Sequence, residues 1–216
     1  MGILDIFKKK PNIQVGDSIF FGKYYFENEK DVQPIEWMVL DCNKSELLLL
    51  SKYCLEITRY CDPWSYDGGM ECSIWEKSYL RNWLNAVFYN QVFSEKEKQR
   101  IVETQIVTDP SLDAPLHQNK VFILSKEQVL ELLPDPDARI GFPTPYALQK
   151  GANTGFSKEM PTWWWTLPYV EIIVQRQPAR IDFPSLVCQD GQVNYHSRLV
   201  GHSFNYCVRP AIKIKK

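Results

Sequence analysis

Two segments near the C-terminal end of the chain concentrate side chains that could recognise a ligand. Trp163-Trp164-Trp165 places three indole rings in a row, and residues 194–206 mix amide, phenol, imidazole, hydroxyl and guanidinium groups. Rigid rings give a large contact area at a small cost in conformational entropy, so such surfaces are typical of sugar and peptide binding. We predict these ligand-binding residues: Trp163, Trp164, Trp165, Asn194, Tyr195, His196, Arg198, His202, Asn205 and Tyr206. Core packing for the tryptophans and an ordinary hydrated loop for the rest are the alternatives.

Covalent chemistry has one candidate in the same region. Cys207 lies close in sequence to His196 and His202, and a Cys–His pair can form a nucleophile. Cys207 also adjoins a predicted strand, where a cysteine is more often a small buried residue. The three histidines are scattered, and the sequence holds no Cys-x-x-Cys pair and no Asp-x-Asp calcium loop, since a proline-rich turn explains Asp135-Pro136-Asp137 without an ion. We therefore assign no catalytic residue, metal or cofactor, and keep an enzyme using Cys207 as the alternative.

The backbone that carries the tryptophans decides which of them a ligand could reach. The segment reads as a strand, in which alternate side chains face opposite sides. Trp163 and Trp165 should then share one face, and Trp164 should take the other. We expect one of these faces to be core and the other to be accessible.

Composition limits the classes of protein that the chain can be. Its 216 residues are 44% apolar and carry a formal net charge of −1, which favours a folded domain over disorder. Without a clustered basic surface we expect no nucleic-acid partner. The run Leu47–Leu50 is too short to span a bilayer. Partners are expected to be an unidentified protein or glycan.

The N-terminal residues 1–12 are expected to form a flexible or weakly docked segment, and residues 13–216 a single domain. Ile3, Leu4, Ile6 and Phe7 form a short apolar face, so contact with a membrane surface is the minor alternative. The lysines follow this face, whereas a signal peptide places its charge before a longer apolar stretch. We therefore expect a cytoplasmic protein whose six cysteines are reduced thiols. Cys61 and Cys72 are the pair most able to approach each other.

Strand patterns occur at both ends of the chain and helical patterns in the middle. Strands are predicted at 18–26, 35–40, 47–51, 121–124, 163–166, 171–175, 185–188, 192–195 and 208–214, with a hairpin turn at Asp190-Gly191. Helices are predicted from a capping box at Ser73, from a second at Ser94 running to about Glu103, from a third at Ser125, and from Thr144. Residues 85–93 are expected to be a connection. This order indicates one α+β domain, with the strand Gly16–Phe26 close to the strand Val208–Ile214.

Several short motifs, taken in order, resemble a known bacterial family. They are Phe21-Gly22, residues 34–40, 48–52, Trp75-Glu76, 80–85, Phe93-Ser94, 121–125, 144–147 and 208–212. As a set, from about Gly16 to the C-terminus, they are similar to the domain-of-unknown-function family number 6273. The family pattern has Trp-Trp-Leu-Arg-Ser-Pro-Gly where this chain has residues 163–169, so a role tied to that arginine has no counterpart here.

The family is in turn similar to C-type-lectin-like domains of the formylglycine-generating-enzyme branch. That likeness rests on a Trp-rich middle strand and a last strand that carries an arginine, Arg209 here. It implies a lectin-like fold with residues 194–206 on the ligand face. The paired cysteines of that branch have no close counterpart, since Cys188 and Cys207 are far apart in sequence. The sequence therefore favours a non-catalytic module that binds a carbohydrate, peptide or protein surface, with a structural subunit of an assembly as a further alternative.

Overall fold

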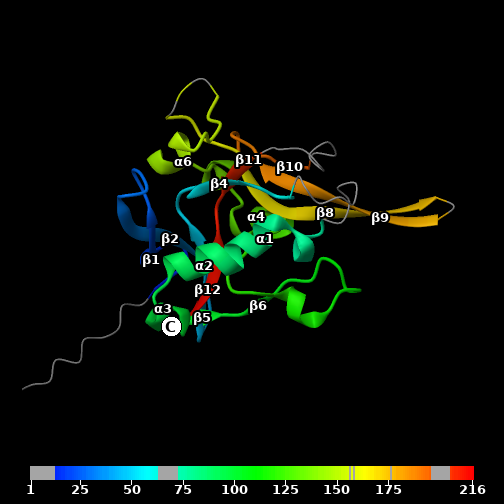
Figure 1. Cartoon of the computed structure of the whole chain (residues 1–216), viewed down its shortest axis with the longest axis horizontal. Helices are drawn as coiled ribbons and strands as arrows, with labels where there is room; N and C mark the ends of the chain where they lie inside the picture. The colour runs from blue at the N-terminus through cyan, green and yellow to red at the C-terminus, as the bar shows by residue number, and fades with distance from the viewer. Residues whose placement is uncertain (1–12, 63–72, 156, 158, 176, 196–204) are drawn as a thin grey trace, which may run out of the picture.

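The first sheet of the protein is built from both ends of the chain. The computed structural model describes residues 13–62, 73–155, 157, 159–175, 177–195 and 205–216. The strand order of this sheet is β1-β2-β3-β12-β5 (Figure 1). Its strands are β1 (Ser18–Tyr25), β2 (Val32–Cys42), β3 (Glu46–Ser51), β12 (Ala211–Lys215) and β5 (Ile101–Val102). Every pairing within it is antiparallel.

The second sheet carries the tryptophan triplet and has the order β10-β9-β8-β11-β4. Its strands are β10 (Val193–Tyr195), β9 (Gln177–Val187), β8 (Trp164–Gln175), β11 (Asn205–Val208) and β4 (Glu56–Arg59). The outer halves of β8 and β9 pair with each other and extend from the body as a two-stranded ribbon (Figure 1). A separate short pair joins β6 (Thr104–Gln105) to β7 (Gln118–Asn119).

The last strands of the chain occupy inner positions in both sheets. β12 lies between β3 and β5, and β11 lies between β8 and β4. The strands Gly16–Phe26 and Val208–Ile214 were expected to pair closely, and this is wrong in detail, because β2 and β3 separate β1 from β12. Strands β1, β2 and β3 follow one another as a meander. The C-terminal strand β12 pairs with the edge of β3 that β2 leaves free.

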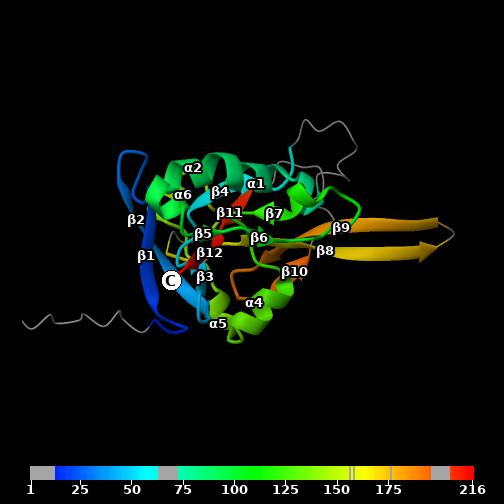
Figure 2. The ribbon, with the colours of Figure 1, turned by 90° about the horizontal axis from the view of Figure 1, so that it is seen from below.

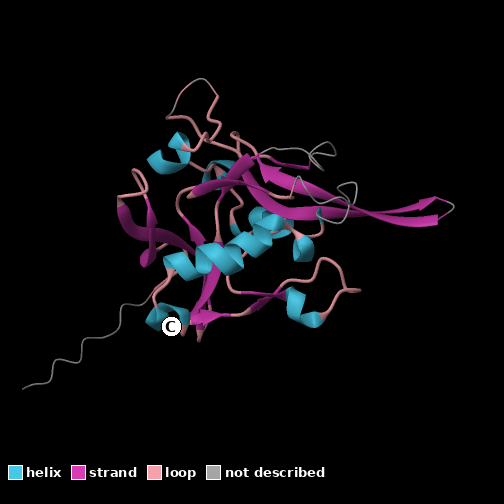
Figure 3. Ribbon diagram, viewed as in Figure 1, coloured by secondary structure: helices cyan, strands magenta, loops and turns pink. Residues whose placement is uncertain are grey.

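Helices cover the strands from two sides (Figures 2 and 3). On one side lies a nearly continuous helical stretch made of α1 (Tyr79–Asn82), the π-helix η3 (Trp83–Phe88) and α2 (Tyr89–Val92). On the other side lie α4 (Lys126–Leu132) and α5 (Pro136–Arg139). The remaining helical elements are η2 (Trp75–Lys77), α3 (Glu95–Lys98), η4 (Ala114–His117) and α6 (Pro145–Gln149).

The predicted start of the first helix is wrong. Ser78, not Ser73, is the N-cap, because its side chain accepts a hydrogen bond from the backbone amide of Arg81. Trp75 stands in a separate 3₁₀ turn before it, held by a bond from its indole nitrogen to Asn119 Oδ1 (3.2 Å). The helical stretch then continues to Val92, so the prediction of a connection at residues 85–93 is wrong for all but Phe93. Asn85 fixes this part, donating to the carbonyl oxygens of Arg81 and Val121.

The other helix caps agree with the sequence. Ser94 and Ser125 both form capping boxes, with Glu97 and Gln128, and Thr144 caps α6. The helix after Ser94 ends at Lys98, short of the expected Glu103, because β5 begins at Ile101. Residues 121–124 are buried as predicted, but they form one isolated bridge from Phe122 to Ala211 instead of a strand.

One hydrophobic core links the two sheets and the helices, so the predicted α+β fold in a single domain is confirmed. The core includes side chains from β1, β3, the helical stretch and β11. The largest fully buried side chains include Trp37, Trp75, Trp164 and Trp165. The prediction of six reduced thiols is wrong at Cys61, which is disulfide-bonded. Its expected neighbour Cys72 lies outside the described residues, as does the segment 1–12.

A buried carboxylate ties three elements of this core together. Glu56 on β4 accepts hydrogen bonds from the hydroxyl groups of Tyr24 on β1 (2.9 Å) and Tyr146 on α6 (3.1 Å). Burial, and then the negative charge of Glu56, raises the pKa of Tyr24 well above its ordinary value of 10. The pKa of Tyr146 is raised for the same two reasons. Both hydroxyl groups therefore stay protonated in the folded protein when ordinary tyrosines ionise.

We expect this cluster to make the protein sensitive to alkali. The folded pKa values lie above the unfolded ones, so the stabilisation is fully present below about pH 10 and is lost as the pH rises further. Tyr24→Phe should lower the free energy of unfolding by about 1 kcal/mol at neutral pH. It should also reduce the loss of stability between about pH 8 and about pH 11. Urea unfolding at both pH values measures this, and an unchanged pH slope in the variant would contradict it.

Candidate functional site

The half-buried Trp163 and Tyr206 form a stacked aromatic pair at one end of the second sheet. Their ring centroids are 5.8 Å apart and their planes differ by 9°. Trp163 directly precedes β8 and Tyr206 lies on β11, and a parallel bridge from Trp164 to Cys207 holds the two strands in register. The amide of Cys207 donates to the carbonyl oxygen of Trp163 (3.1 Å). The pair is thus positioned by backbone pairing between segments about forty residues apart in the chain.

An open depression of about 350 Å³ lies beside this pair. It is lined by Trp163, Cys188, Gln189, Asp190 and Asn194. Four of these five residues come from the β9–β10 turn and the start of β10. The depression therefore combines one aromatic ring with amide and carboxylate groups.

The β9–β10 turn, which supplies the polar groups, is held in place by close packing against Pro136 and by a hydrogen bond to Pro161. Gly191 adopts a φ of 76°, and a Cβ atom there would lie 2.2 Å from the carbonyl oxygen of Pro136. Gln189 Nε2 donates to the carbonyl oxygen of Pro161 (2.7 Å), and Asn194 Nδ2 donates to Cys188 Sγ (3.3 Å). The hairpin predicted at Asp190-Gly191 is confirmed, and it is what presents Gln189 and Asp190.

Trp164 and Trp165 do face opposite sides of the strand, but the expected difference in their exposure is wrong. Trp164 is 0% exposed and Trp165 is 1% exposed, although they point to opposite faces of β8. Trp164 Nε1 donates to the carbonyl oxygen of Arg139 (3.0 Å), and Trp165 Nε1 to that of Thr58 (2.9 Å). Both faces of the strand are covered at this point, so period-2 alternation gives no accessible face. Trp163 is partly exposed because it stands before the strand begins.

The other predicted residues divide into two groups. Asn205 is exposed at the start of β11, and Tyr195 ends β10. His196, Arg198 and His202 lie outside the described residues. Gln189 and Asp190 were not predicted as site residues, although the turn signal of Asp190-Gly191 could have pointed to them.

The motifs noted along the sequence agree with an independent comparison. The family model described as Domain of unknown function (DUF6273) matches residues 44–216, which is more than half of the chain. The chain belongs to this family. Nothing among curated proteins or solved structures matches it. The DUF6273 match contains all the candidate site residues and begins after β1 and β2, later than the resemblance noted from about Gly16.

The surroundings of this DUF6273 site raise the pKa values of the Tyr206 hydroxyl and the Cys188 thiol, so both stay protonated at neutral pH. Burial raises the pKa of the Tyr206 hydroxyl, and the nearby Cys188 raises it further. Burial also raises the pKa of the Cys188 thiol, against the hydrogen bond from Asn194, which lowers it. Besides the Trp163 ring, the depression therefore offers a thiol, two side-chain amides and the carboxyl group of Asp190, which suits hydrogen bonding to a polar ligand.

Cys207 has no access to this depression. It is 0% exposed, and its pKa is raised well above the ordinary range by a hydrogen bond with Cys54 and by burial. A nucleophilic cysteine needs the opposite environment, one that lowers the pKa and admits a substrate. No group of three or more His, Cys, Asp or Glu side chains that could hold a metal ion occurs within the described ranges.

We expect thiol labelling to follow these environments. Cys42 is partly exposed, whereas Cys54 and Cys207 are fully buried. Cys42 should react first with a maleimide or disulfide reagent in the native DUF6273 protein. Cys207 should react at least about 100-fold more slowly, because it requires local or global opening. Mass spectrometry of timed, quenched samples measures both rates, and fast labelling of Cys207 would favour the enzyme alternative.

Proposed function

We propose that the protein is a non-catalytic binding module that recognises a carbohydrate, peptide or protein surface through the depression beside Trp163 and Tyr206. One observation carries the proposal: Trp163, which is stacked on Tyr206, lines an open depression together with Gln189, Asp190 and Asn194. An aromatic face packs against the apolar side of a sugar ring, while amide and carboxylate groups bond its hydroxyls. Of the three ligand classes, this combination supports a carbohydrate best.

A C-type-lectin-like fold and a bacterial source are finer parts of the same proposal. In their support, the Trp-rich strand and the arginine near the last strand, which suggested the likeness, lie in contact. The Arg209 guanidinium is centred 5.3 Å from the Trp164 ring. Asn194, from the segment 194–206 that the likeness implies for a ligand face, also lines the depression.

Two rival functions make different predictions. An enzyme using Cys207 with His196 or His202 requires a reactive thiol, which the labelling experiment tests. A structural subunit of an assembly requires self-association through exposed apolar side chains. Phe20 and Val32, on paired strands, are 68% and 52% exposed. A concentration-dependent mass in light scattering would favour the subunit, and a constant monomer mass the binding module.

The proposed location is the cytoplasm, and the disulfide at Cys61 counts against it. The structure has a disulfide at Cys61, and disulfides are rare in cytosolic proteins because cellular thiol reductants reduce them. None of the helices within the described ranges has the length and apolar character needed to cross a bilayer. Acid trapping of thiols in the native host, followed by non-reducing electrophoresis, distinguishes the cases. A reduced Cys61 supports the cytoplasm, and an oxidised one overturns it.

A glycan array with matched variants tests the binding proposal. We expect Trp163→Ala to weaken binding of any glycan hit at least roughly tenfold, as loss of a central aromatic contact does. Phe142→Ala is the control, since Phe142 is an aromatic side chain that is 46% exposed outside the site. Both variants should remain folded by circular dichroism. Equal binding by the wild type and Trp163→Ala would contradict the proposal.

A further inference from the structure

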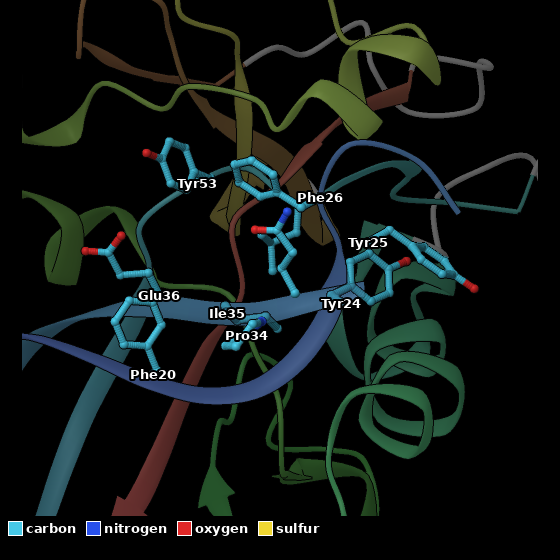
Figure 4. A pocket seen from close by; sticks show the side chains of 10 residues that line it. Phe20, Tyr24, Tyr25, Phe26, Pro34, Ile35, Glu36 and Tyr53 are labelled. Atoms are coloured by element: carbon cyan, nitrogen blue, oxygen red, sulfur yellow. The ribbon is translucent and has the colours of Figure 1, made fainter. Parts of the chain in front are cut away.

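A second cavity, remote in sequence from the candidate site, lies against the β1–β2 hairpin. Its volume is about 180 Å³ (Figure 4). The wall is aromatic on several sides, with Phe20, Tyr24, Tyr25, Phe26 and Tyr53. Pro34 and Ile35 form the floor in the view of Figure 4, and Glu36 stands across the cavity from Tyr24 and Tyr25.

Glu36 lines the same cavity, and its carboxylate keeps its negative charge. Burial acts to raise its pKa, but hydrogen bonds from Lys52 and Ser18 outweigh this and lower the pKa. Phe20 is the direct cross-strand neighbour of Glu36. The rings of Phe26 and Tyr53 meet edge to face, with centroids 5.9 Å apart. A fixed negative charge thus stands beside several π-systems.

The protein's own Lys52 already makes the contacts that such a site would offer to a cation. Its ammonium nitrogen lies 2.9 Å and 3.0 Å from the two carboxylate oxygens of Glu36. The same nitrogen lies 5.7 Å from the centroid of the Tyr53 ring, within the range of a cation–π contact. The Lys52 side chain is 42% exposed and that of Glu36 is 21% exposed. An exposed ion pair of this kind contributes little to stability, so a ligand can displace it at small cost.

We propose that the cavity bordered by Tyr25, Phe26, Glu36 and Tyr53 binds an alkylammonium group, which takes the place of the Lys52 ammonium. Aromatic side chains with a neighbouring carboxylate are the chemistry that recognises methylated or free ammonium ions. The cavity is smaller than the roughly 300–1,000 Å³ of pockets for drug-sized ligands, so it suits one headgroup or one side-chain end. This proposal is independent of the function proposed for the Trp163 site.

The alkylammonium group can come from a free small molecule or from a lysine side chain of a peptide. Tetramethylammonium and choline represent the first source. A short capped peptide with one central lysine, unmodified or trimethylated, represents the second. Titration of each into isotope-labelled protein, followed by amide chemical shifts of β1 and β2, separates the sources. Constant ionic strength, kept with sodium chloride, removes general salt effects.

The decisive variants change the two charges separately. Glu36→Gln should weaken tetramethylammonium binding about three- to tenfold, because the carboxylate is lost while the rings remain. Lys52→Gln should strengthen binding by a similar factor, because it removes the internal competitor. Lys44→Gln, an exposed lysine in the β2–β3 turn, makes the same change in net charge and should leave binding unchanged. Melting curves confirm that all three variants fold.

Three results would overturn the proposal. The first is the absence of chemical-shift changes near β1 and β2 with any of the four probes. The second is equal binding of tert-butanol, a neutral molecule of similar shape to tetramethylammonium, which would make the cavity an apolar site. The third is a Lys52→Gln variant that binds no more tightly than Lys44→Gln. Each of these results is independent of the glycan experiment, so either proposal can fail alone.

Discussion

Trp164→Ala is expected to lower the free energy of unfolding by about 3–5 kcal/mol, a large part of the stability of a typical domain. The ring is fully buried, and its indole nitrogen satisfies the carbonyl oxygen of Arg139. Gly141 packs so closely that a Cβ atom there would lie 2.7 Å from Trp164 Cδ1. The alanine variant thus leaves a cavity that the rigid surroundings cannot fill.

The neighbouring tryptophans provide matched comparisons for this experiment. Trp165→Ala should cost about as much as Trp164→Ala, since that ring is also buried and its nitrogen also bonds a carbonyl oxygen. Trp163→Ala should cost clearly less, because the ring is only half-buried. Urea unfolding of the three purified variants measures the ranking. A Trp163→Ala loss as large as the other two would mean that Trp163 is a core residue and would remove the main support for the binding site.

Arg209→Ala is expected to cost about 3 kcal/mol. Arg209 is 1% exposed, donates through Nε to the carbonyl oxygen of Ser51 (2.8 Å) and lies over the Trp164 ring. Burial lowers its pKa to about 10, which still leaves it charged at neutral pH. Replacing Arg209 with alanine would open a cavity and remove the hydrogen-bond donor of the Ser51 carbonyl oxygen. Removing the desolvated charge offsets part of that loss.

A methionine variant separates these opposing effects. Arg209→Met keeps most of the volume and removes the charge, so it should be at least about 1 kcal/mol more stable than Arg209→Ala. Because Arg209 and Trp164 are in contact, the double alanine variant should lose less than the sum of the single losses. Chemical denaturation of the wild type, the three single variants and the double variant tests both statements. A methionine variant as unstable as the alanine variant would show that hydrogen bonding, and not volume, dominates.

The sequence predicted most of the elements of the fold because their signals are local. The capping boxes at Ser94 and Ser125 and the turn at Asp190-Gly191 each depend on residues a few positions apart. The start of α1 was mispredicted because its determinant is distant. Asn119, 44 positions from Trp75, holds that residue in a separate turn, and no pattern around Ser73 contains this information.

The candidate site was predicted by residue type and not by geometry. Aromatic composition pointed to Trp163 and Tyr206, but their stacking depends on a parallel bridge between β8 and β11. Strand alternation did not predict the burial of both Trp164 and Trp165. It tells which face of the strand each ring occupies, but not whether other parts of the protein cover that face. The disulfide at Cys61 was missed for a related reason: the sequence predicts a cytoplasmic protein, and reduced thiols follow from that compartment and not from the geometry around Cys61.

The inner position of β11 and β12 has a consequence for how the protein folds during synthesis. β12 pairs with β3, so Ala211 meets Leu50 across about 160 residues of chain. Closing such a loop costs entropy that no local contact repays, and parallel or long-range strand pairing slows folding. Neither sheet can be completed until residues 205–215 have left the ribosome. Until then the apolar edge of β3 stays open, so the nascent chain should depend on a chaperone that shields exposed strands.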